Sequence, residues 1–315
     1  TGAGLVGIGK DALYANTTGN HNTAVGVDAL EANTTASDNT AVGQNALKLN
    51  TTGSTNTAIG SHSLNSNVTG NSNTALGFQA LEDNTADENT AVGKAALMNN
   101  TSGTGNTALG TFVLDAATTA NYNTGIGYKA LTDNTASNNT AVGYKSLEDN
   151  TSGTDNVAVG YIALNSNTTG NYNTALGYAA LTTNTTARDN SALGYKALEN
   201  NTTGAYNTGL GYQALRANTT ASYNAAVGNH ALESNTTGAS NVAVGYNSLS
   251  SNTTGAGNTG VGTSALDATT TGNYNTAVGK DALAGNTTGT KNTAVGYEAL
   301  DAATTAERNT AFGYK

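Results

Sequence analysis

Few side chains in this sequence could carry out chemistry, and those few are widely separated. Histidine occurs only as His21, His62 and His230, and cysteine is absent. A metal site or a nucleophile–base pair requires several such groups within a few ångströms of one another. Serine is plentiful, but no base recurs beside it at a fixed spacing. We therefore predict no catalytic residue, no cofactor and no metal site, and we expect that the protein is not an enzyme.

Two glycine-rich triplets and the acidic residues have equally plain interpretations. Residues 125–127 and 209–211 read Gly-x-Gly, as in phosphate-binding loops, but the helix that such loops require is not predicted after them. Carboxylates gather in pairs, as at residues 82–83 and 148–149. A calcium site is one interpretation, yet the dense, regular aspartate spacing of calcium-binding β-rolls is missing. A solvated acidic face is the better interpretation.

Tyrosine has the spacing that most suggests a contact surface. Six tyrosines follow one another at intervals of 16 or 17 residues, and a second series contains Tyr122 and Tyr274. Equivalent rings on adjacent coils would form a row that either stabilises the fold by stacking or offers an aromatic stripe for self-association or carbohydrate contact. Both interpretations stay open. The candidate contact stripe consists of Tyr128, Tyr144, Tyr161, Tyr178, Tyr195 and Tyr212.

These intervals come from one tandem repeat that fills all 315 residues. Counted from Asn22 as position one, the unit reads N-T-A-V-G-x-x-A-L-x-x-N-T-T-G-x-x. It recurs every 17 residues, apart from two steps of 16 that begin at Asn73 and Asn123. Position five is always Gly, and position nine is Leu in every complete unit. Helical repeats need roughly 33 residues or more, so this unit predicts one coil of a β-solenoid.

Each unit divides into a strand and a turn. The segment N-T-A-V alternates as a strand does, whereas N-T-T-G has turn chemistry, and both 16-residue units are shortened there. Coils of this kind stack at about 4.8 Å, so the array would reach on the order of 90 Å. The predicted fold class is all-β, a parallel β-solenoid (β-roll) with about 17 residues per coil and about 18 coils. We expect residues 1–315 to form a single continuous domain.

Identical positions in stacked coils should form ladders. Positions four and nine are predicted to build the core, with position two at its edge, through Val25, Leu30, Val42, Leu47, Ile59, Leu64, Val142 and Leu147. The glycine at position five would occupy a bend or a close backbone approach, as at Gly26, Gly43, Gly60 and Gly143. The asparagines at positions one and twelve could stack as amide ladders between coils.

Composition narrows the range of partners. A net charge of −9 and a pI near 4.6 disfavour nucleic acid and anionic membrane surfaces. No apolar run approaches the ~20 residues that span a bilayer, so we expect no membrane insertion in this segment. Asn-x-Thr/Ser triplets recur in the turns; they are either acceptor sites for glycosylation or simply good turn sequence. They include Asn16, Asn33, Asn50, Asn150, Asn167, Asn235 and Asn252.

The pentad at residues 22–26, followed by Ala29 and Leu30, resembles the head repeats of trimeric autotransporter adhesins, the haemagglutinin-type β-roll repeats. It is also similar to repeat arrays in phage tail fibres. For that family the resemblance implies a left-handed parallel β-roll, often trimeric, that is displayed outside the cell and used for attachment. The repeat of the family is typically a few residues shorter, and the extra length here falls in the N-T-T-G turn.

We expect a non-enzymatic structural protein that is extracellular or on the cell surface, as a fibre or filament subunit or an adhesin shaft. No cap is recognised at either end of the sequence, so we expect a longer fibre or a subunit that stacks. Self-association would occur end to end or as a trimer, and a glycan or cell-surface receptor is the other expected partner. The alternative is a surface module that binds a glycan, a host receptor or ice through its Thr, Asn and Tyr ladders. Against ice, the obvious threonines are adjacent in a turn rather than in an outward Thr-x-Thr file.

Overall fold

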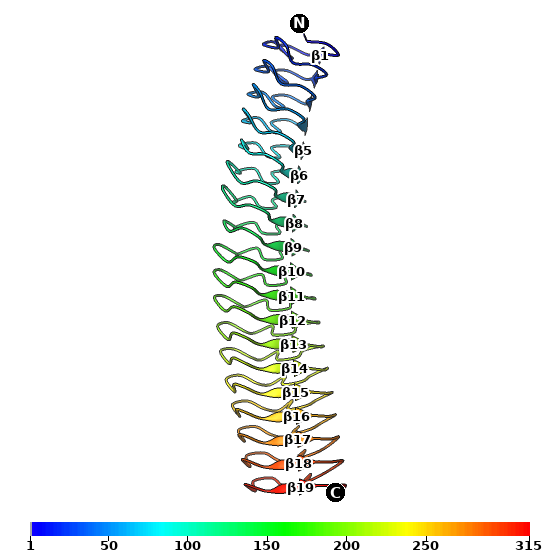
Figure 1. Cartoon of the computed structure of the whole chain (residues 1–315), viewed down its shortest axis with the longest axis vertical. Coiled ribbons are helices and arrows are strands. Elements are labelled where there is room, and N and C mark those ends of the chain that lie inside the picture. Colours follow the sequence, from blue (N-terminus) through cyan, green and yellow to red (C-terminus); the bar gives the residue numbers. More distant parts are fainter. Residues whose placement is uncertain (1) are drawn as a thin grey trace. The chain divides into compact units, whose positions relative to one another are not determined.

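The computed structural model describes residues 2–315, which form a parallel β-solenoid of about 18 coils. Residue contacts divide the chain into two compact units, Thr1–Asp155 and Asn156–Lys315. Within each unit, every coil contributes one three-residue strand, and turns and bends make up the rest (Figure 1). The described residues contain no helix. The predicted fold class is confirmed.

The strands recur at the repeat period. In the first unit they are β1 (Val6–Ile8), β2 (Thr23–Val25), β3 (Thr40–Val42), β4 (Thr57–Ile59), β5 (Thr74–Leu76), β6 (Thr90–Val92), β7 (Thr107–Leu109), β8 (Thr124–Ile126) and β9 (Thr140–Val142). In the second unit they are β10 (Val157–Val159), β11 (Thr174–Leu176), β12 (Ser191–Leu193), β13 (Thr208–Leu210), β14 (Ala225–Val227), β15 (Val242–Val244), β16 (Thr259–Val261), β17 (Thr276–Val278), β18 (Thr293–Val295) and β19 (Thr310–Phe312).

Successive strands of a unit pair in parallel with equivalent residues opposite one another. Thr23 pairs with Thr40, and Thr40 pairs with Thr57. The two shorter coils keep this register, because β5 and β6 still align from their first residues, as do β8 and β9. Each deletion is therefore absorbed outside the strand, as the sequence predicted for the N-T-T-G turn.

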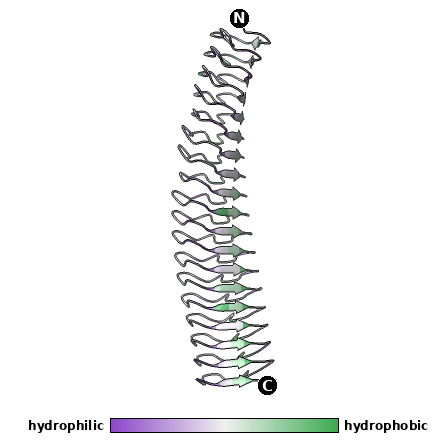
Figure 2. Ribbon diagram, viewed as in Figure 1, coloured by the Kyte–Doolittle hydropathy of each residue, from purple (hydrophilic) through white to green (hydrophobic). Residues whose placement is uncertain are grey.

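The leucine at position nine lies in the interior. Leu30, Leu47, Leu64 and Leu147 are completely buried, and the alanines at positions three and eight around them are also buried. Apart from these leucines and alanines, the hydrophobic residues of the second unit lie mainly on the strands (Figure 2). Leucine and alanine thus form a thin core in each unit.

The prediction that position four belongs to the core was wrong. Val25, Val42 and Val142 are only half-buried, and Ile59 is 39% exposed, because positions two and four point outward and position three points inward. The interior has room for little more than a methyl group there. At Gly209, which stands where most units have Ala, a Cβ would already lie 3.4 Å from Leu198 Cγ. The large aliphatic side chains therefore take the opposite face of the strand.

Position five requires glycine for both of the predicted reasons. Gly26, Gly43, Gly60 and Gly143 have φ between 137° and 141°, a region that L-residues rarely adopt. A Cβ on Gly26 would also lie 2.4 Å from the carbonyl oxygen of Gly43 in the next coil. The bend and the close backbone approach occur at the same residue.

Each coil also bends at left-handed residues that are not glycine. Leu30 has a φ of 50°, and Asp28 and Asp38, at positions seven and seventeen, have φ of 57° and 61°. This conformation costs roughly 1–2 kcal/mol per residue. Burial of the leucine offsets the cost, and the Leu30 N–H donates a 3.1 Å hydrogen bond to Ala46 O of the next coil. Leucine also lacks a branch at Cβ, which would raise the energetic cost of a positive φ.

Candidate functional site

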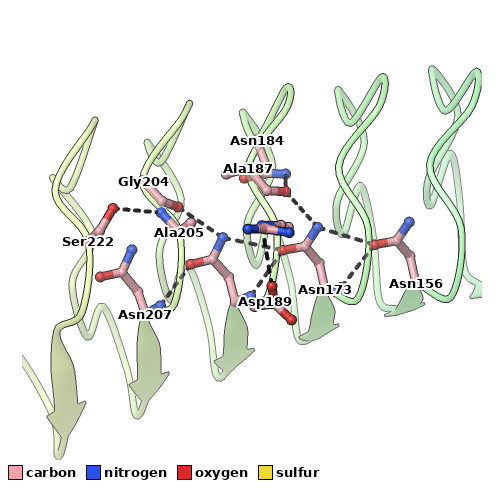
Figure 3. A network of polar contacts seen from close by, with 11 residues as sticks. Asn156, Asn173, Asn184, Ala187, Asp189, Gly204, Ala205, Asn207 and Ser222 are labelled. Carbon is pink, nitrogen blue, oxygen red and sulfur yellow. Dashed lines mark hydrogen bonds and ion pairs between the residues drawn. The ribbon is translucent and has the colours of Figure 1, made fainter.

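The asparagines at position one form a ladder inside each unit, which we call the first amide ladder. The Asn39 N–H donates to Asn22 Oδ1 at 2.9 Å, and Asn39 Nδ2 donates to Gly53 O at 2.9 Å. In the second unit the same pattern joins Asn156 and Asn173 (Figure 3). All of these side chains are completely buried. Since unpaired buried amides are costly, the ladder ties each coil to its neighbour.

The asparagines at position twelve form a second amide ladder. Asn33 Nδ2 donates to Asn16 Oδ1 at 2.7 Å and to Ala36 O at 3.1 Å. In the second unit each Nδ2 donates to the preceding Oδ1 over 2.8–3.1 Å, without interruption, through Asn167, Asn184, Asn201, Asn218, Asn235 and Asn252. The prediction that both sets of asparagines stack is confirmed.

The second amide ladder is interrupted in both units. In the first unit the buried Asn67 Oδ1 has no partner, because Asn84 Nδ2 of the shortened next coil donates to Ala86 O. In the second unit the ladder ends where position twelve is not asparagine. Thr269 follows Asn252, and the buried Asn252 Oδ1 has no hydrogen-bond partner. Asn286 Nδ2 reaches Thr269 Oγ1 only at 3.4 Å. These interruptions are weak points of an otherwise regular interior.

Most of the Asn-x-Thr/Ser triplets, for which glycosylation was one of two interpretations, have a buried asparagine in the folded chain. Asn33, Asn50, Asn150, Asn167, Asn235 and Asn252 all belong to the second amide ladder and are completely buried. Asn50 Nδ2, for example, donates to Asn33 Oδ1 and Gly53 O. A glycosyl transferase must reach that nitrogen, so these triplets act in the folded state as interior turn sequence. Asn16, the first member, is half-buried.

The tyrosines of the candidate contact stripe stack on one another within each unit. In the second unit the ring centroids of Tyr161, Tyr178, Tyr195 and Tyr212 are successively 5.1, 5.2 and 5.2 Å apart, with interplanar angles of 6–14°. In the first unit Tyr128 and Tyr144 stack at 5.6 Å. All six rings are between 41% and 45% exposed. Stacking covers ring faces, so the row stabilises the coils and presents mainly ring edges and hydroxyls to solvent.

Lysine–glutamate pairs flank this tyrosine row. Lys196 Nζ lies 5.7 Å from the centroid of the Tyr195 ring and 2.9 Å from Glu199 Oε1. The hydrogen bond to Glu199 holds the pKa of Lys196 above its ordinary value. Lys145 forms the same kind of pair with Glu148, and the hydrogen bond to Glu148 raises the pKa of Lys145. These half-buried pairs make the surface polar beside the rings.

The second tyrosine series, at position seventeen, includes more exposed rings. Tyr206 and Tyr223 stack at 5.1 Å. Tyr122 and Tyr274 are 66% and 63% exposed, and their rings lie against the glycine at position seventeen of the preceding coil. A Cβ at Gly105 would come within 2.8 Å of the Tyr122 ring, so glycine makes room for that packing.

The outward strand face, formed by positions two and four, was not recognised from the sequence as a surface. In the first unit it carries Thr at position two of every strand from β2 to β9, beside Val, Ile or Leu at position four. Leu76 and Leu109 are 44% and 45% exposed. Positions two and four hold no charged residue in any of the strands, although the chain has 33 charged side chains in all. The alternation N-T-A-V was visible, but the side of the strand that faces solvent was not.

The histidines lie apart, each with its own neighbours. His21 lies 3.5 Å from Asp38, His62 is hydrogen-bonded to Ser61 and Asn45, and His230 Nδ1 lies 2.6 Å from Glu233. Among residues 2–315 no three His, Cys, Asp or Glu side chains come together in a way that could hold a metal ion.

One open surface pocket was not predicted from the sequence. It has a volume of about 260 Å³ and is lined by Phe112, Asp115, Lys129 and Thr132. Burial, with a smaller effect from the charge of Asp133, raises the pKa of Asp115 above its ordinary value. The only sequence signal was that this coil departs from the repeat, with an aromatic residue at position seven and Val113 in place of Ala or Ser at position eight.

No protein-family model matches this sequence, and a search of curated proteins finds no similar sequence. The described residues also contain no helix with the length and hydrophobicity that crossing a lipid bilayer demands. The resemblance to adhesin head repeats therefore rests on the residues of the repeat alone.

Proposed function

We propose that the protein is a non-enzymatic structural element, the shaft of an extracellular fibre, filament or adhesin. The observation that carries the proposal is the way adjacent coils are joined within each unit. Backbone hydrogen bonds, a leucine column and two asparagine ladders link one coil to the next. Distributing the same bonds over every coil suits a molecule that holds a fixed spacing under load.

Self-association and attachment are parts of the same proposal. Copies would associate end to end or as a trimer, in keeping with the resemblance to adhesin head repeats. A glycan or cell-surface receptor would be held by exposed side chains. Tyr122 and Tyr274 of the second tyrosine series are candidates, because their exposed rings pack against a glycine. The stacked tyrosine row is the weaker candidate, because its ring faces are largely covered.

Electron microscopy of producing cells, with a gold-labelled antibody against the chain, tests the proposal. We expect label on thin fibres or projections outside the cell, and elongated particles in negative stain of the purified material. Label confined to the cell interior, or round particles without any fibre, would overturn it. Protease treatment of intact cells is the control, because a surface fibre loses its outermost label while an internal protein does not.

A further inference from the structure

Two sets of threonines recur along the first unit, and their hydroxyls differ in hydrogen bonding. The turn threonines at position thirteen are used inside the fold: Thr34 Oγ1 donates to Thr51 O at 3.1 Å, and Thr51 Oγ1 donates to Val68 O. The strand threonines at position two are different. Within the described part of the first unit, none of their hydroxyls hydrogen-bonds to another protein group. They are Thr23, Thr40, Thr57, Thr74, Thr90, Thr107, Thr124 and Thr140.

The free hydroxyls form a regular file, in register from strand to strand. Each strand threonine pairs in register with the one on the next strand, including across both shortened coils at Thr74–Thr90 and Thr124–Thr140. Hydrogen-bonded strands lie about 4.8 Å apart, so hydroxyls and methyl groups repeat at that interval. A second file of Val, Ile and Leu side chains runs beside them at position four.

We propose that this outward strand face of the first unit, from β2 to β9, binds ice. Its hydroxyls would take places in the outermost water lattice, and the methyl groups of Thr and the neighbouring aliphatic side chains would hold the water between them in order. The interval between strands is close to one of the oxygen repeats of hexagonal ice. The amide ladders beneath keep the file rigid, so little ordering entropy is lost when the lattice forms.

The chemistry of the face favours ice over other occupants. A file of threonines that repeats at one interval matches an occupant that repeats at the same interval, which a globular partner does not. The absence of charge on the two files removes electrostatic attraction to charged polymers. Dry packing against a second copy would bury a threonine hydroxyl on each rung, at a cost of about 1–3 kcal/mol for each one left unpaired. Water satisfies every hydroxyl.

Thermal hysteresis and inhibition of ice recrystallisation, measured on the whole chain, test this proposal. We expect both activities in the unaltered protein and their loss in the double variant Thr90→Lys/Thr107→Lys, which places two long charged side chains in the middle of the file. The matched control is Ser102→Lys/Thr119→Lys, which adds the same charges at exposed turn positions of the same two coils. The control should keep both activities, and far-UV circular dichroism should show both variants folded.

Three outcomes would overturn the proposal. The first is no ice activity in the unaltered chain, and the second is an equal loss of activity in both double variants. The third is that light scattering shows the unaltered chain to be an oligomer and the Thr90→Lys/Thr107→Lys variant to be dissociated. The last would assign the face to contacts between copies. The proposal is independent of the shaft role, since a fibre without ice activity, or ice activity in a protein that forms no fibre, separates the two.

Discussion

Replacing one interior asparagine tests whether the amide ladders hold the coils together. Asn201 Nδ2 donates to Asn184 Oδ1 at 3.0 Å and to Gly204 O at 2.9 Å, and Asn201 Oδ1 accepts from Asn218 Nδ2 at 2.8 Å. Asn201→Ala removes all three hydrogen bonds. At a net value of about 1 kcal/mol each the loss is about 3 kcal/mol, and leaving the buried Asn184 Oδ1 without its donor raises it toward about 4 kcal/mol.

The adjacent residue supplies the control. Asn200 has the same side chain but is exposed, so Asn200→Ala should change the free energy of unfolding by no more than about 0.5 kcal/mol. Urea denaturation followed by far-UV circular dichroism measures both variants. Hydrogen exchange should show faster opening of the coils around Asn201, because stability in a stacked repeat depends on neighbouring coils. Equal stability of Asn201→Ala and Asn200→Ala would refute the role of the ladder.

Three further predictions follow from the packing and from one perturbed carboxyl group. Thr269→Asn should raise the free energy of unfolding by about 1 kcal/mol, because the new amide can donate to the unpaired Asn252 Oδ1 and accept from Asn286. Thr271→Asn, at an exposed position, is the control in thermal melts. An equal gain in the control would count against the mechanism. Gly194→Ala should destabilise the protein by several kcal/mol, since its Cβ would lie 2.4 Å from Gly211 O at a φ of 137°. Gly209→Ala is the control, because its position is Ala in most units, and its free energy of unfolding should stay within about 1 kcal/mol of that of the unaltered chain. Similar urea midpoints for the two variants would contradict this prediction. Burial raises the pKa of Asp115, so the native state binds a proton more tightly than the unfolded state, and the stability of this site rises as the pH falls from neutral through that raised pKa. Asp115→Asn lacks this dependence, so its gain in stability over the unaltered chain should be largest near neutral pH and shrink on acidification. A difference in stability between the two proteins that does not vary with pH would show that the carboxyl does not titrate as described.

The repeat period carried most of the fold. A unit of 17 residues is too short for paired helices, and it holds one alternating segment and one turn, so a coil per unit is the remaining solution. The position of the turn was also readable, because both shortened units lose their residue in N-T-T-G. Leu30 and its equivalents were correctly predicted to be buried, since a large apolar residue at the same place in every coil forms a continuous column that is stable only away from water.

The candidate surfaces were less readable. The six tyrosines of the contact stripe were identified, but only the ring geometry shows that their faces are covered by one another. The strand face could not be identified from the sequence, because the alternation N-T-A-V does not say which side of the strand faces solvent. The more conspicuous threonines of N-T-T-G are bonded to the next coil, as Thr34 is. The surface pocket beside Phe112 is lined by residues of two adjacent coils, which only the stacking brings together.

The sequence by itself determined the coil, its period, its leucine column and the place of its turn, because these follow from spacing along the chain. Only the tertiary structure decided which side of each strand faces inward. A strand of three residues offers two orientations that local hydrophobicity does not separate, with Ala24 on one side and Val25 on the other. The leucine opposite leaves room for a methyl group and no more, so alanine turns inward and the valine and threonine are left on the surface.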